Sequence, residues 1–282
     1  MSVAVIYLVR GADGWWRSAA DTFLASYRSH DSGAAHLPFV ILKGFPDAAS
    51  LAQARALFAE QAFEIIHLPD DGFDIGAYAA AARLVKEDHL CFFNTHSEIL
   101  GHRWLAKFMV HLSAADVGLV GATGSYESLR PLSRHFLKFP NVHVRSNAFA
   151  IERMTFCSIV EGVDISSKRD AYRFESGRRS LTRLVLKRGK RVVLVGRNGR
   201  AFPPEWWPFS GTFRQGLQEN LLVADNMTRA YESSTWLEKE FLVQQTWGRF
   251  VREENYSSDL GELEKALQIP TSASLVGQGA AE

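Results

Sequence analysis

Short apolar runs alternate with segments of helical periodicity along the first half of the chain. The apolar runs have the length of buried strands and are Val3–Val9, Pro38–Gly44, Phe63–Leu68 and His89–Phe93. The segments between them are amphipathic or rich in alanine and predict helices over Trp15–Tyr27, Ala48–Gln61 and Ile75–Val85. This order predicts an α/β fold, with a mostly parallel or mixed sheet flanked by helices on both faces.

The second half of the chain continues this pattern and then departs from it. Further strands are predicted at Val117–Val120 and Arg191–Val195, and further helices at Trp104–Leu112, Leu181–Leu186 and Trp236–Arg249. Another apolar segment lies at Asn147–Ile151. The stretch Phe202–Phe209 is rich in aromatic residues and proline, and the chain from Gln268 onward is rich in Ser, Gly and Ala. We therefore expect a main domain over 1–200, an aromatic and helical extension packed on it over 201–267, and a flexible tail over 268–282.

Composition excludes several classes of protein. The chain is 46% hydrophobic and 22% charged, which is ordinary for a globular protein and unlike a disordered one. Lys and Arg number 32 against 31 Asp and Glu, so no general affinity for nucleic acid is expected. The first ten residues have no basic flank ahead of their apolar run and predict a strand rather than a signal peptide. Cys91 and Cys157 lie in apolar stretches and are expected as small buried side chains in a reducing cytoplasm.

Polar residues follow the apolar run that ends at Phe93. In an open α/β sheet, ligands bind just beyond the carboxyl ends of the strands, so the segment Asn94–Glu98 is placed where chemistry occurs. His96 and Glu98 could hold a divalent metal if both side chains turn the same way. The alternative is that they form hydrogen bonds within the loop.

The turn Asp70–Asp74 precedes a predicted helix. We expect Asp71 or Asp74 to cap that helix near Ile75. Gly76 lies in its first turn, and a helix start with exposed N–H groups can also bind phosphate, so both interpretations stay open.

A glycine-rich turn and a basic segment are further candidates. Gly118–Gly124 follows a strand, but no helix or acidic residue follows at the spacing of a dinucleotide site, so a tight loop near a ligand is expected. Ten Lys and Arg residues fall within 168–191 and form either a solvated face or a site for an anionic substrate. Glu175 stands just ahead of Arg178 and Arg179, either as a base or as an anchor in an ion-pair network.

Together these features resemble the inverting nucleotide-sugar glycosyltransferases of the GT-A fold, in particular the bacterial polysaccharide and O-antigen transferases. Four segments carry the resemblance: Val9–Gly11, Gly72–Tyr78 followed by Ala79–Ala82, Phe92–Glu98, and Phe174–Glu175 with Leu181–Arg183 and Arg188–Val192. The family's Asp-x-Asp metal motif is here Asn94-Thr95-His96.

The resemblance implies a role for several residues. Glu175 would be the catalytic base, and the donor-binding residues would be Arg10, Gly11, Asp74, Gly76, Asn94, Arg178 and Arg179. Either His96 and Glu98 hold a Mn or Mg ion, or arginines balance the diphosphate, with Arg145 as a further candidate.

The activity so implied is transfer of a sugar from a nucleotide-diphosphate sugar to a saccharide or lipid-linked acceptor in bacterial surface polysaccharide synthesis. Such a protein would be cytoplasmic, with peripheral contact to the inner face of the membrane where the acceptor is lipid-linked. The aromatic side chains of Trp206, Trp207 and Phe209 would line the acceptor side or pack in the core. Because the metal carboxylate is missing, a catalytically inactive protein that binds nucleotide or carbohydrate is the alternative.

Overall fold

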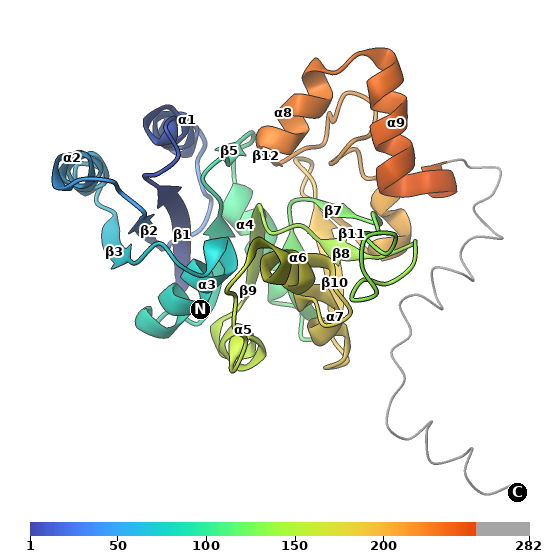
Figure 1. The fold of residues 1–282 in the computed structure, drawn as a ribbon, viewed down its shortest axis with the longest axis horizontal. Coiled ribbons are helices and arrows are strands. Elements are labelled where there is room, and N and C mark those ends of the chain that lie inside the picture. The colour runs from blue at the N-terminus through green and yellow to red at the C-terminus, as the bar shows by residue number, and fades with distance from the viewer. Residues whose placement is uncertain (252–282) are drawn as a thin grey trace, which may run out of the picture.

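The computed structural model describes residues 1–251, and its centre is an eight-stranded sheet (Figure 1). The strand order is β11-β10-β6-β9-β4-β1-β2-β3. Its strands are β1 Val3–Arg10, β2 Leu37–Lys43, β3 Glu64–Leu68, β4 His89–Phe93, β6 Val117–Gly121, β9 Ala148–Glu152, β10 Arg191–Val195 and β11 Ala201–Phe202. All neighbours are parallel except that β9 runs antiparallel to both β4 and β6, and β11 runs antiparallel to β10.

Helices cover both faces of this sheet, as the sequence predicts. One face packs against α1 Trp16–Ser29, α2 Ala48–Ala59 and α4 Trp104–Leu112. The other packs against α3 Phe73–Leu84, α5 Arg153–Val160, α6 Lys168–Ser176 and α7 Leu181–Leu186. Side chains of β1 alternate between the two cores, with Val5 and Tyr7 in one and Ile6 and Leu8 in the other. The α/β class and the mixed, mostly parallel sheet are therefore confirmed.

Two small sheets and the C-terminal elements complete the described part of the chain. β5 Glu98–Ile99 pairs with β12 Val223–Ala224, and β7 Gly124–Ser125 pairs with β8 His143–Val144. The remaining helices are η1 Pro204–Phe209, α8 Asn226–Ser233, α9 Trp236–Trp247 and η2 Gly248–Val251. The expected boundary at residue 200 stays a prediction, and the predicted tail at 268–282 lies outside the described residues.

The aromatic stretch after β11 contributes to the core. Trp207 is fully buried in the same apolar cluster as α3 and α7, and its indole N–H donates to the carbonyl of Phe202 at 2.9 Å. Trp206 is about half exposed. Between residues 1 and 251, no helix combines the length and the apolar character needed to cross a bilayer.

Candidate functional site

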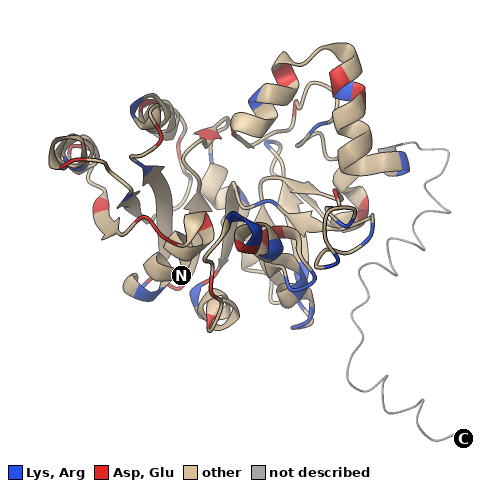
Figure 2. Cartoon of the chain, viewed as in Figure 1, with Lys and Arg blue, Asp and Glu red and all other residues tan. Residues whose placement is uncertain are grey.

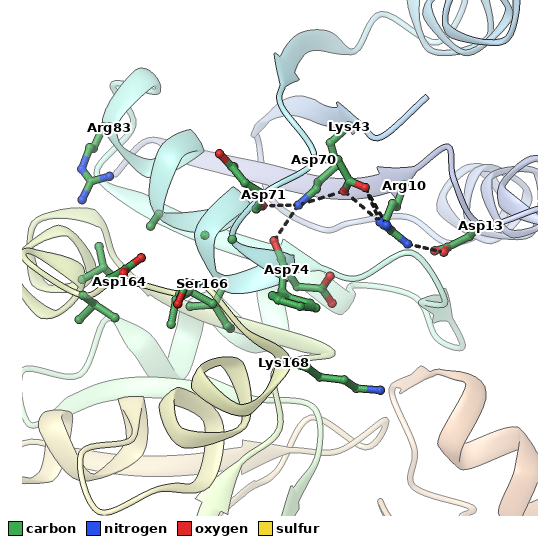
Figure 3. Close-up of a pocket in the computed structure, with 18 residues that line it drawn as sticks. Arg10, Asp13, Lys43, Asp70, Asp71, Asp74, Arg83, Asp164, Ser166 and Lys168 are labelled. Carbon is green, nitrogen blue, oxygen red and sulfur yellow. Dashed lines mark hydrogen bonds and ion pairs between the residues drawn. The ribbon is translucent and has the colours of Figure 1, made fainter. Parts of the chain in front are cut away.

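A cavity of about 880 Å³ lies beyond the carboxyl ends of β1, β2 and β3 (Figure 3). Arg10 ends β1, Lys43 ends β2, and Asp70 follows β3. The start of α3 and the loop between α5 and α6 close the other sides, and Lys168 at the start of α6 also reaches this cavity. We call it the strand-end cavity; it lies where open α/β sheets bind their ligands.

An ion-pair network joins the strand ends that form this cavity. Arg10 Nε donates to Asp70 Oδ1 at 2.9 Å, and Arg10 Nη2 donates to Asp70 Oδ2 at 2.6 Å. Arg10 Nη1 also lies 3.1 Å from the carboxylate of Asp13. The hydrogen bond from Arg10 holds the pKa of Asp70 below its ordinary value. This network fixes the Arg10 guanidinium at the cavity wall and already offsets part of its charge.

Lys43 is the most deeply buried cation of this site, at 2% exposure. Its Nζ donates to the carbonyls of Asp71 at 2.5 Å and Phe73 at 3.1 Å, and it lies 3.6 Å from Asp70 Oδ1 (Figure 3). Burial lowers the pKa of Lys43, against the pull of the neighbouring carboxylates. Lys43 therefore ties the turn before α3 to the end of β2.

The first turn of α3 has a different cap from the one expected. The N-cap is Gly72, with φ +66°, and no side chain caps the helix, so the prediction that Asp71 or Asp74 does so is wrong. A Cβ on Gly72 would lie 2.9 Å from Gly76 Cα, so the turn requires glycine. Without a side-chain acceptor, first-turn N–H groups of α3 remain available to a ligand.

Asp74 lies in this first turn and lines the strand-end cavity (Figure 3). Among residues 1–251, its carboxyl group has no hydrogen-bond partner. Burial raises the pKa of Asp74, and the charges of Glu175 and Asp13 raise it further, while Lys43 and Arg10 act in the opposite direction. An unpartnered carboxyl in a cavity is available as a hydrogen-bond acceptor for ligand hydroxyl or N–H groups.

A second cavity of about 630 Å³ is also lined by α6 and contains Glu175. Glu175 Oε1 accepts hydrogen bonds from Ser146 N at 2.7 Å and Ser146 Oγ at 3.0 Å. His143 and Tyr172 also line this cavity. Helix α6 therefore connects the two cavities, with Lys168 lining the first and Tyr172 and Glu175 lining the second.

Glu175 and the arginines after it are not placed together. Glu175 lies in the last turn of α6, ahead of α7 as expected. Arg178 and Arg179 are exposed and line neither cavity; they border a separate hollow with Arg188. Arg178 Nε donates to the carbonyl of Arg134 at 3.1 Å. The second cavity instead contains Arg145, which pairs with buried Asp225 at 2.7 Å.

The polar segment after β4 forms hydrogen bonds within its own loop. Asn94 Oδ1 accepts from His96 N at 3.1 Å and from Ser97 Oγ at 3.0 Å. The imidazole of His96 lies against the indole of Trp15, with ring centroids 4.3 Å apart, and burial lowers the pKa of His96. This loop arrangement is the alternative that the sequence left open.

The side chains of this segment do not form a metal site as they stand. Glu98 pairs with Arg229 at 3.1 Å, and Arg229 also donates to the carbonyl of His96 at 3.0 Å. Within the described residues, no three His, Cys, Asp or Glu side chains are grouped closely enough to hold a metal ion. The donor set around His96 and Glu98 therefore does not fit a divalent metal.

The glycines singled out in the sequence serve close packing. Gly11 is buried, donates to the carbonyl of Lys43 at 2.8 Å, and has no room for a Cβ beside the ring of Phe45. In the segment Gly118–Gly124, a Cβ on Gly121 would lie 2.3 Å from Val144 and one on Gly124 would lie 2.8 Å from Trp207. The glycines of this segment thus allow close contact with other parts of the chain. The sequence had predicted close contact with a ligand instead.

Two important residues were not identified from the sequence. Lys43 stands at the end of an apolar run, directly before Gly44, and a charged residue at a strand end is a usable signal. Ser146 carries no such signal, because its partner Glu175 is remote in the sequence.

No protein-family model and no curated protein matches the chain. Among solved structures, the chain is similar to a glycosyltransferase of Streptococcus pneumoniae in its apo form, with TM-score 0.46, 14% identity, and coverage of 96% of this chain and 65% of that one. It is similar to 4-diphosphocytidyl-2C-methyl-D-erythritol synthase of Anaerococcus prevotii, with TM-score 0.41, 8% identity, and coverage of 61% and 80%. It is also similar to glucosyl-3-phosphoglycerate synthase of Mycobacterium tuberculosis, determined with Mn²⁺, UDP and phosphoglyceric acid, with TM-score 0.37, 14% identity, and coverage of 55% and 56%. Likenesses this remote lend no weight to an activity, so function has to be argued from the cavities.

Proposed function

We propose that this protein is a glycosyltransferase that binds a nucleotide-diphosphate sugar in the strand-end cavity and an acceptor in the second cavity. The observation that carries this proposal is that α6 borders both cavities, with Lys168 at one and Glu175 at the other. A group-transfer enzyme needs two adjoining sites and a base between them, because reactants held in line react far faster than in solution.

The strand-end cavity has the chemistry to hold the donor. Cationic groups of Arg10, Lys43 and Lys168 and the N-terminus of α3 favour a diphosphate. The carboxyl of Asp74 is an acceptor for ribose hydroxyl groups or for a base N–H. In this proposal, Arg10, Asp74 and Gly76 contact the donor, whereas Gly11 and Asn94 support the surrounding loops.

The carboxylate of Glu175 would act as the base. It would take the proton of an acceptor hydroxyl while that oxygen forms a bond to the anomeric carbon from the face opposite the diphosphate. The bond between the anomeric carbon and the diphosphate oxygen breaks, its electron pair leaves with the nucleoside diphosphate, and the anomeric configuration inverts. Base assistance is typically worth about 10² to 10⁴ in rate, and cations beside the departing diphosphate lower the barrier further.

The proposed acceptor is a saccharide or a lipid-linked saccharide of bacterial surface polysaccharide synthesis. The second cavity combines polar groups with the exposed aromatic ring of Tyr172. Sugars present hydroxyl groups at their edges and apolar C–H faces, and this mixture of polar and flat apolar side chains suits both.

A protein that binds the donor but does not transfer it is the second candidate. Its support is the segment Asn94-Thr95-His96 and the pairing of Glu98 with Arg229, which leave the donor set around His96 unsuited to a metal ion. Such a protein would use the strand-end cavity alone.

Calorimetric titration with UDP- and GDP-linked sugars, each with and without Mn²⁺, tests the donor site. Binding of one nucleotide class, weakened by Asp74→Ala and unchanged by Asp21→Ala on α1, is expected. Release of nucleoside diphosphate in the presence of saccharide acceptors would then distinguish transfer from binding alone. If no nucleotide sugar binds under any of these conditions, both candidates are wrong.

A further inference from the structure

The basic residues of this chain are concentrated in one part of the sequence. Residues 130–191 contain 15 Lys or Arg and 5 Asp or Glu, whereas the whole chain contains 32 and 31. Figure 2 shows blue segments gathered on α6, α7 and the loop that follows β7. The near-neutral total therefore conceals a strong local excess of positive charge.

Arginines of this region surround two neighbouring hollows that share His135. The loop between β7 and β8 is held to α6 and to the turn after it, because Arg169 Nη2 donates to Ser133 Oγ at 3.2 Å and Arg178 Nε donates to the carbonyl of Arg134. The arginines form one continuous group that we call the arginine surface: Arg130, Arg134, Arg169, Arg178, Arg179 and Arg188.

The charge of the arginine surface is largely uncompensated. In the part of the chain that the structure describes, none of its six guanidinium groups forms an ion pair with a carboxylate. The acidic residues at the same hollows are Glu161, Asp164 and Asp170, of which Asp170 pairs with Arg173 at 3.1 Å. This positive charge lowers the pKa of His135. The main cause is the charge of Arg173, and burial, Arg169 and Arg134 contribute further.

An apolar side chain projects from the middle of this surface. Leu132 is 81% exposed and lies between Arg130 and Arg134 in the loop that joins β7 and β8. Exposure of a leucine side chain to water is unfavourable, and a polar partner does not relieve it. Its transfer into the acyl boundary of a bilayer is favourable, while the flanking arginines remain at the level of the headgroups.

We propose that the arginine surface and Leu132 dock this protein on a bilayer that contains anionic lipids. Headgroup phosphates match the guanidinium forks, and the acyl region takes up the leucine. A nucleic acid would satisfy the arginines but leave Leu132 without a partner, which is why the bilayer is favoured.

Docking in this way would have a consequence for the second cavity. Leu132, Ser133 and Arg169 line both the arginine-rich hollow and the second cavity. If the proposed function holds, the acceptor site therefore opens where the protein meets the lipid surface, which favours an acceptor carried by a lipid. The docking proposal itself does not depend on that function.

Sedimentation with vesicles tests the proposal on the intact chain without any nucleotide sugar. Vesicles of phosphatidylcholine alone are compared with vesicles that also contain phosphatidylglycerol, at low and high salt. The first variant is Arg134→Gln with Arg179→Gln, whose side chains form no hydrogen bond within residues 1–251. Its matched control is Arg55→Gln on α2 with Lys86→Gln just after α3, both exposed. The second variant is Leu132→Asp, with Leu217→Asp, also largely exposed, as its control.

The wild type is expected to bind only the anionic vesicles, and less tightly as salt rises. Loss of two arginines should weaken binding by about 25-fold, since each basic residue near such a surface contributes about a factor of five. Leu132→Asp should weaken it about tenfold, and both controls should bind as the wild type does. Absence of binding to anionic vesicles at low salt, or equal weakening by the control pair, overturns the proposal. The proposal is also overturned if the protein binds single-stranded RNA more tightly than anionic vesicles and Leu132→Asp leaves that RNA binding unchanged.

Discussion

Glu175 is held by Ser146, whose backbone N–H and hydroxyl both donate to the same carboxylate oxygen, at 2.7 and 3.0 Å. Within residues 1–251, the other oxygen, Oε2, has no hydrogen-bond partner. One oxygen of the carboxylate thus fixes its orientation, while the other can accept a proton in the second cavity.

The variant Glu175→Gln tests the role of this carboxylate. It keeps the size of the side chain and a hydrogen-bond acceptor for Ser146 but removes the base. Transfer should fall by about 10² to 10⁴, while calorimetry should give the wild-type affinity for the nucleotide sugar. Glu60→Gln, an exposed site at the C-cap of α2, serves as the control. Near-normal transfer by the Glu175 variant would refute the assignment.

Ser146→Ala tests whether the orientation of Glu175 matters. This variant removes the hydroxyl donor and keeps the backbone N–H, so about 1 to 2 kcal/mol of hydrogen bonding to the carboxylate is lost. We expect kcat to fall about tenfold with KM for the donor unchanged, because the proposed donor site is the strand-end cavity. Recovery of kcat by Ser146→Thr would separate positioning from a general loss of structure. A change in donor KM alone would contradict this role.

The partly buried carboxyl of Asp74 should make stability depend on pH. Its pKa is raised in the folded state, so the folded protein holds the proton to higher pH than the unfolded chain does. The free energy of unfolding therefore falls as pH rises from the unfolded pKa through the raised folded pKa. Asp74→Asn should stabilise the fold at pH 7.5 by about 1 kcal/mol and much less at pH 3.5, while nucleotide affinity drops.

Urea unfolding at the two pH values measures this effect. Asp21→Asn, an exposed carboxylate on α1, should show no such difference between the two pH values. A stabilisation that is as large at pH 3.5 as at pH 7.5 would show that the ionised form of Asp74 is not its cause.

Lys43→Met is expected to destabilise the protein. The lysine is almost fully buried, and its loss leaves the carbonyls of Asp71 and Phe73 without their donor. Hydrogen bonds from a charged donor contribute about 1.5 to 3 kcal/mol each, so the free energy of unfolding should drop by about 3 kcal/mol. The exposed Lys86→Met should change it by less than about 0.5 kcal/mol. Equal stability of both variants would exclude a structural role for Lys43.

The contact between Trp15 and His96 provides an optical readout of the loop after β4. A protonated imidazole against an indole ring quenches its fluorescence, and the pKa of His96 lies below its ordinary value because of burial. The emission of Trp15 is taken as the difference between the wild type and Trp15→Phe. As the pH is lowered, this emission should decrease, with the midpoint of the decrease below pH 6.5. His96→Gln should abolish this transition. A midpoint above pH 6.5 would contradict the burial of the ring.

Sequence periodicity predicts most of the elements that bury apolar faces, but not α5, which buries Phe156, Ile159 and Val160. The strand His89–Phe93 and the helices Trp104–Leu112 and Leu181–Leu186 are observed with the predicted bounds. Helix α6 is missed because it buries little beyond Phe174, and its start is marked by the reciprocal hydrogen bonds of Ser167 and Asp170. The two-residue strands depend on partners far away in the sequence, so no local pattern predicts them.

The site was predicted less completely than the fold, for a similar reason. Strand ends direct attention to Arg10 and Asn94, because their positions follow from the strands themselves. The separation of Arg178 from Glu175 follows from where α6 ends and the chain turns, which is a tertiary property. The cap at Gly72 requires a left-handed backbone, and the nearby Asp71 and Asp74 give a misleading local signal.

The reversed direction of β9 gives this edge of the sheet a polarity that a fully parallel sheet lacks. Strands β4 and β6 leave the sheet at this rim, whereas β9 enters the sheet there. The opening residues of a reversed strand bring an amide hydrogen to the same rim, and Ser146 supplies it just ahead of β9. The reversed direction of this one strand thus places a backbone N–H group where it stabilises the carboxylate of Glu175.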